Sequence, residues 1–178
     1  MKNILALIVI TFLSVTVVSA APGDEPEQIV ISETVNGSFG KVWRSVKRSM
    51  EAFGCPKPQI EKIIEPAEEG GLYKGQYISD YCILSEGEDS TRDVIEKYSV
   101  APRIRGSIWV TCRVQYKLNV KEEEGGKTKI ILRAEMSGFE EFITAANHFW
   151  VSNGDLERSM MLSILKYTQE ELQKSTSE

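Results

Sequence analysis

The segment that most constrains the fold covers residues 103–121, where apolar and polar residues alternate. Apolar side chains take the even positions from Ile104 to Val120, and polar or basic ones take the odd positions, apart from Trp109. A period of two puts the two sets on opposite faces of an extended strand. The segment therefore predicts a long antiparallel strand with one buried face and one solvated face.

The flanking sequence predicts the rest of a sheet, with helices at both ends. EEEGGK (122–127) has the glycines of a hairpin turn, after which 128–139 returns with matching alternation. Apolar spacings of three and four predict helices over 39–53 and 153–173. Shorter strands are expected at 28–34, 59–65 and 72–84. This order predicts an α+β fold, a curved antiparallel sheet packed against a long C-terminal helix and a shorter N-terminal one.

Two stretches lack a strong period. Residues 85–102 are rich in charge and turn formers, and we interpret them as a loop insertion with at most one short helix near 92–98. Residues 140–151 form a connection without an assigned structure. Neither stretch separates two cores, so residues 27–174 are expected to form a single domain.

The N-terminus has the pattern of a secretory signal peptide. Lys2 precedes an uncharged apolar run, and Val18 and Ala20 are small enough for the −3 and −1 positions of a cleavage site after Ala20. The run is shorter than the ~20 residues of a membrane-spanning helix. We therefore expect a signal peptide over 1–20, a flexible mature start over 21–26, a disordered tail over 175–178, and a periplasmic or secreted protein.

The charge balance limits the partners. The formal net charge is −5, which argues against nucleic acid because phosphate contacts need a basic surface. Basic residues nevertheless share one face of the first helix: Lys41, Arg44, Lys47 and Arg48. This face is a candidate contact surface for an acidic protein or lipid headgroups, and the alternative is an ordinary solvated helix face.

Catalytic signals are weak. His148 is the only histidine, and no nucleophile, phosphate-binding or zinc motif accompanies it. Carboxylates cluster in turns, where solvent holds their pKa values low. The stretch SNGDLE (152–157) is explained as a helix start, with acidic residues in the first turn. We expect no enzyme activity, no cofactor and no metal site.

Three cysteines allow at most one internal bridge. Cys82 and Cys112 both fall on expected strands, so a cross-strand bridge between them is one alternative, with Cys55 free. A Cys55–Cys82 bridge and three unpaired buried thiols are the others.

The segments FGKVWRSVKRSMEAFG, RVQYKLNVKEEEGGKTKIILRAEM and SNGDLE together resemble a helix-grip domain of the START and Bet v 1 type. More narrowly, they resemble the BamC-like envelope proteins of bacteria. The resemblance implies a sheet gripping the C-terminal helix and carries no catalytic residues. In such a fold, the space between sheet and helix would be lined by Ile108, Val110, Cys112, Val114, Tyr116, Ile130, Leu132, Met136, Met160, Met161, Ile164 and Leu165.

Two functions follow as expectations. The first is a non-catalytic envelope module that binds a protein partner or an envelope surface. The second is a carrier of an apolar small molecule or lipid between sheet and helix, which the adaptable methionines would suit. The alternative to the carrier is a closed core.

Overall fold

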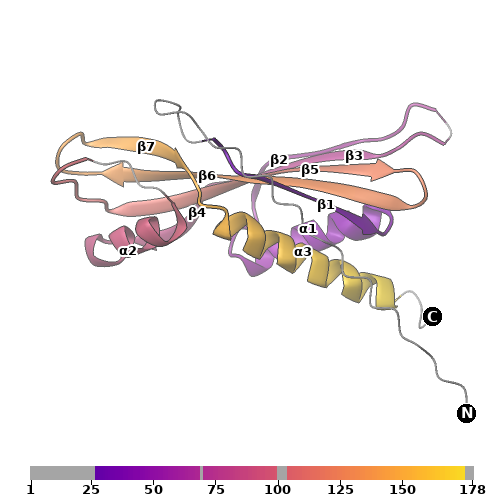
Figure 1. Ribbon diagram of the computed structural model, residues 1–178. Helices are drawn as coiled ribbons and strands as arrows, with labels where there is room; N and C mark the ends of the chain where they lie inside the picture. The colour runs from indigo at the N-terminus through magenta and orange to yellow at the C-terminus, as the bar shows by residue number, and fades with distance from the viewer. Residues whose placement is uncertain (1–26, 69, 100–103, 175–178) are drawn as a thin grey trace, which may run out of the picture.

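The computed structural model describes residues 27–68, 70–99 and 104–174, which form one antiparallel sheet and three helices (Figure 1). The strands are β1 (Val30–Asn36), β2 (Pro58–Ile64), β3 (Lys74–Ser79), β4 (Cys82–Glu86), β5 (Thr111–Glu123), β6 (Lys127–Glu140) and β7 (Ala146–Val151). The helices are α1 (Phe39–Ala52), α2 (Glu88–Tyr98) and α3 (Asp155–Lys174). The predicted α+β class with a C-terminal helix is confirmed.

The long hairpin of β5 and β6 forms the centre of the sheet. Its register runs from Arg113 opposite Ser137 to Glu123 opposite Lys127. At the hairpin end the sheet has the order β1-β6-β5-β3-β2, and at the other end β4 pairs with β5 while β7 pairs with β6. The β5–β6 hairpin therefore runs through the whole sheet and is flanked by different strands at its two ends.

All three helices lie on the same side of the sheet (Figure 1). The even-numbered residues of β5 and β6 face them, and Val114, Leu118, Ile130 and Leu132 are almost completely buried there. Helix α1 contributes Val42, Val46 and Met50 to the same core, from one face of the helix, as its spacing predicted. We call this side the helix face and the opposite side the open face.

Three boundaries differ from the predictions. The expected strand over 72–84 is divided into β3 and β4, because the chain breaks at Asp80, whose amide donates to the Lys57 carbonyl. The expected loop over 85–102 contains the last residues of β4 and the helix α2, which is anchored by buried Thr91 and Ile95. The short helix allowed near 92–98 is therefore present, and it begins earlier than expected, at Glu88. Thr91, Val94, Ile95 and Tyr98 have the helical spacing that places them on its packed face.

The expected strand over 103–121 begins later than predicted. Regular pairing starts at Thr111, and an isolated bridge between Trp109 and Glu140 precedes it. The unassigned connection over 140–151 contains β7, which extends the sheet beside β6. No helix in the described part of the chain is long and apolar enough to cross a membrane. The predicted signal peptide, mature start and C-terminal tail lie outside the described residues.

Candidate functional site

The basic residues of α1 are largely engaged within the molecule. Arg44 Nε lies 3.1 Å from the Glu171 carboxylate, and Arg48 Nη1 lies 2.7 Å from that of Glu170. Both acidic residues belong to α3, so these pairs join the two helices. Lys47 Nζ lies 3.0 Å from Glu61 on β2, and Lys41 also has an interaction within the protein. The proposed contact surface on α1 therefore has much of its charge compensated.

The residues expected to line a ligand cavity between sheet and helix mostly pack against one another in the core. Nine of the twelve are at most 3% exposed: Cys112, Val114, Tyr116, Ile130, Leu132, Met136, Met160, Met161 and Ile164. Ile108 and Val110 precede β5 and are only partly buried, because the strand begins later than predicted. Leu165 is partly buried and packs at the edge of this core.

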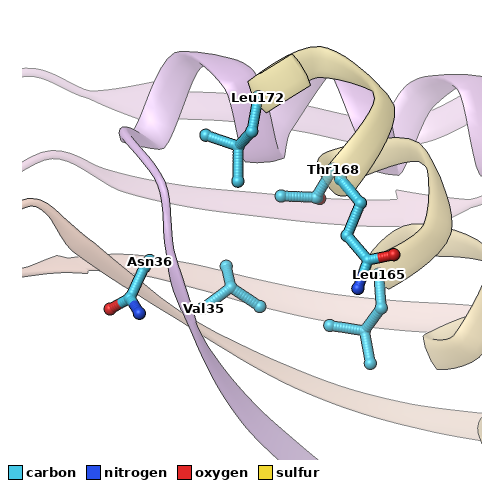
Figure 2. Close-up of a pocket in the computed structure, with 6 residues that line it drawn as sticks. Val35, Asn36, Leu165, Thr168 and Leu172 are labelled. Atoms are coloured by element: carbon cyan, nitrogen blue, oxygen red, sulfur yellow. The ribbon is translucent and has the colours of Figure 1, made fainter. Parts of the chain in front are cut away.

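A small groove lies between β1 and α3 (Figure 2). It has a volume of about 250 Å³ and is lined by Val35, Asn36, Leu165, Thr168, Gln169 and Leu172. The Thr168 hydroxyl is buried and has no hydrogen-bond partner among the described residues. Of the predicted cavity residues, only Leu165 reaches this groove.

Glu140 is a buried carboxylate at the end of β6. It accepts hydrogen bonds from the amides of Ile108, Phe142, Ile143 and Thr144 and from the Thr144 hydroxyl. Burial by itself raises the pKa of Glu140, but these donors outweigh it and lower the pKa to about 2. The carboxylate therefore holds the β6–β7 loop in its conformation.

The same loop places the single histidine. The Thr144 hydroxyl, which donates to Glu140, lies 2.7 Å from His148 Nε2, so the imidazole donates to that oxygen. His148 also packs edge-on against Trp109. A nucleophile is activated when a histidine accepts its proton, and here the hydroxyl donates to the carboxylate instead. The arrangement orients His148 without activating Thr144.

Glu157, which the sequence places in the first turn of the last helix, is a buried carboxylate. The Ser152 hydroxyl lies 2.5 Å from both of its oxygens, and the Ala134 amide lies 3.2 Å from one of them. Burial raises the pKa of Glu157, although these hydrogen bonds act in the opposite direction. The stretch SNGDLE is thus a helix start, as predicted, whose Glu157 also fastens α3 to β6.

The disulfide joins Cys55 to Cys82, with Cα atoms 5.4 Å apart, and Cys112 is a buried free thiol. Of the alternatives that the sequence left open, the Cys82–Cys112 bridge is wrong and the competing Cys55–Cys82 bridge is the one that forms. Strands β4 and β5 are neighbours, but their register places Cys82 opposite Val114 and Cys112 opposite Ser85. The two sulfur-bearing residues are therefore offset along the strands, whereas Cys55 follows α1 and reaches Cys82 directly.

No helix covers the open face of the sheet in the described part of the chain, because all three helices lie on the other side (Figure 1). The strand registers determine which side chains share it, because directly paired residues point to the same face. Its basic residues are Lys62, Lys74, Arg113, Lys117, Lys121, Lys127, Lys129 and Arg133, and its acidic residues are Glu86, Glu123 and Glu135. The excess of basic side chains contrasts with the net charge of −5.

Apolar side chains also reach solvent on the open face. Ile60 and Ile64 lie on β2, Ile83 on β4 and Phe149 on β7, and each is exposed. The Arg113 side chain lies between Ile83 and Ser137 in one cross-strand row, and its buried Nε has no partner among the described residues. Sequence reasoning found the polar alternation of β5 but not the assembled face.

The described residues contain no group of three or more His, Cys, Asp or Glu side chains arranged to hold a metal ion. The comparisons with known proteins add no further assignment: no protein-family model, curated protein or solved structure matches the chain at a significant level.

Proposed function

We propose that this chain is an exported, non-catalytic binding module of the cell envelope, with a helix-grip fold, that binds its partner through the open face of the sheet. One observation carries this proposal. The helix face is covered by α1, α2 and α3, whereas the open face combines exposed aliphatic side chains with a basic excess in an acidic protein. Surfaces of this composition are characteristic of interaction sites.

The position of α3 supports the helix-grip assignment. The helix packs against β1 and β6, and its start is attached to β6 by the hydrogen bond from the Ala134 amide to Glu157. The strand order at the hairpin end places α1 and α3 side by side beneath the sheet. A C-terminal helix held by an antiparallel sheet is the arrangement that the resemblance implied.

Strand β2 offers a matched test of which face binds. Ile64 is 51% exposed and pairs with Lys74 on the open face, whereas its neighbour Ile63 is 44% exposed and pairs with Gly75 on the helix face. An aspartate at either position therefore adds the same charge to the same strand at similar exposure. Only the face differs between the two variants.

The experiment is sedimentation of the mature protein with washed bacterial envelopes. We expect Ile64→Asp to weaken binding by about tenfold or more, since it removes an apolar contact worth about 1–2 kcal/mol and adds an anion, while Ile63→Asp binds like the wild type. Equal binding by the two variants would exclude the open face. Absence of wild-type binding to any envelope fraction would remove the proposed function.

The groove between β1 and α3 favours a second candidate function, the binding of a short apolar group. Val35, Leu165 and Leu172 provide apolar walls, and the unpartnered Thr168 hydroxyl provides one polar contact. Its volume of about 250 Å³ lies below the ~300–1,000 Å³ of usual ligand pockets. Native mass spectrometry should then detect a small bound mass that Leu165→Trp eliminates, and a bare wild-type protein would reject this candidate.

A further inference from the structure

Three lysines lie side by side across the open face. Lys74 on β3 is directly opposite Lys121 on β5, and Lys121 is directly opposite Lys129 on β6. Directly paired residues have their Cβ atoms about 4.5–5.5 Å apart, so the three ammonium groups project from adjacent positions. We call Lys74, Lys121 and Lys129 the lysine row.

The row carries uncompensated charge. No ion pair joins its lysines, or the nearby Lys62, to a carboxylate within the described part of the chain. Glu135 on the same face is already occupied by Lys117 at 2.6 Å, and Glu123 lies opposite Lys127 at the hairpin end. Like charges placed directly opposite destabilise a sheet. A bound anion would remove that repulsion.

We infer that the lysine row binds an anionic lipid bilayer surface, with phosphate headgroups as the counter-charges. This inference rests on the proposed function and names its partner. The row lies on an exposed sheet face and spans three strands, as a planar array of headgroups requires. It consists of lysines, which act as compact point charges, whereas recognition of individual carboxylates favours the planar fork of arginine.

Apolar side chains at the edge of the sheet fit the same surface. Ile64 extends the lysine row onto β2, and Ile60 lies on the same side of that strand. Both are exposed, so they can enter the interfacial layer while the ammonium groups remain at the level of the phosphates. Each lysine near an anionic bilayer contributes about fivefold to the binding constant, from about 1 kcal/mol of attraction.

The test uses the mature protein and two kinds of vesicles, phosphatidylcholine alone and phosphatidylcholine mixed with phosphatidylglycerol. We expect binding to the anionic vesicles only, decreasing as salt is raised from about 0.05 M to about 0.5 M. Lys121→Glu with Lys129→Glu should weaken binding by at least about twentyfold, from two lost attractions and two new repulsions. This variant turns the repulsion between positions 74 and 121 into an attraction and leaves positions 121 and 129 like-charged, as they are in the wild type, so its melting temperature should not fall.

The control has the same charge change elsewhere. Lys97 lies on α2 and Lys166 on α3, away from the open face. Lys97→Glu with Lys166→Glu should weaken binding to the anionic vesicles by only about twofold to threefold, which is the general effect of the lower net charge. The inference is overturned if the wild type ignores phosphatidylglycerol vesicles, or if the lysine-row variant and the control bind equally. If either vesicle result occurs while Ile64→Asp binds bacterial envelopes more weakly than Ile63→Asp does, the open face is still the binding surface, and its partner is a protein.

Discussion

The Ser152 hydroxyl donates a hydrogen bond of 2.5 Å to the Glu157 carboxylate, and both side chains are buried under the start of α3. Burial raises the pKa of Glu157, so the folded protein retains a proton that the unfolded chain releases. The stability from this group is full below the unfolded pKa, about 4.3, and is lost as pH rises through the folded pKa. The pair therefore makes stability depend on pH.

We expect Glu157→Gln to remove this dependence. The free energy of unfolding of the wild type should fall relative to that of the variant as pH rises above about 4.3, because only the wild type must bury a charge. Urea unfolding at a series of pH values measures the difference. Parallel curves for the two proteins would show that Glu157 does not titrate with a raised pKa.

Ser152→Ala tests the hydrogen bond itself. The change leaves Glu157 with one buried donor fewer, so we expect a loss of about 1–3 kcal/mol in the free energy of unfolding at neutral pH. The loss should be smaller in the Glu157→Gln background, since the acceptor is then uncharged. A double-mutant cycle by urea unfolding measures this coupling, and additive losses would contradict it.

The Cys55–Cys82 bridge closes a loop with a sequence separation of 27. Loss of such a bridge gives the unfolded chain more conformational freedom, so we expect the free energy of unfolding to fall by about 3–4 kcal/mol. Cys55→Ser with Cys82→Ser should therefore unfold at lower denaturant concentration, and a reductant should destabilise the wild type but not the variant.

Thiol labelling supplies the control for that prediction. Cys112 is buried, and burial raises the pKa of its thiol to about 12, so it should react only when the protein unfolds. Peptide mapping of the oxidised protein checks the bridge directly, and a peptide pair linked through Cys82 and Cys112 would contradict the Cys55–Cys82 pairing.

Alternation in the sequence predicted the central hairpin because it is a local property. The even positions of β5 and β6, such as Val114 and Leu132, are buried as their period required. The ends of the strands were harder to predict from the sequence. Residues 104–110 make one isolated bridge, between Trp109 and Glu140. Glu140 ends β6, where β7 pairs with that strand, and the sequence of residues 104–110 does not indicate this distant partner.

The candidate sites were harder to predict because their partners are distant in sequence. The basic residues of α1 appeared unpaired, yet Arg44 and Arg48 contact glutamates 127 and 122 residues further along the chain. The lysine row likewise needs two strand registers, although the hairpin turn alone would have indicated that Lys121 faces Lys129. Local patterns determine which face a residue occupies, and tertiary pairing determines its neighbours.

Glu140 provides a prediction with the opposite pH dependence. Its pKa is lowered to about 2 by the loop donors, so the stability it contributes is present above the unfolded pKa, about 4.3, and is lost as pH falls through the folded value. Glu140→Gln should therefore be less stable than the wild type at neutral pH, and the gap should close between about pH 4 and pH 2. Acid unfolding followed by tryptophan fluorescence measures this. A gap that is independent of pH would refute the role of the carboxylate charge.

Gly75 on β3 packs directly against α1, and a Cβ atom there would clash with the Trp43 ring and lie 2.9 Å from Phe39 Cζ. Both rings belong to the buried face of α1. Gly75→Ala should therefore lower the free energy of unfolding by about 1–3 kcal/mol through overpacking. Gly40→Ala is the matched control, because its nearest contact would be Arg44 Nη1 at 3.9 Å and the position is helical. It should stabilise the protein by about 0.4–1 kcal/mol. Denaturant unfolding of both variants checks the pair, and equal stabilities would mean that α1 can move away from β3 at little cost.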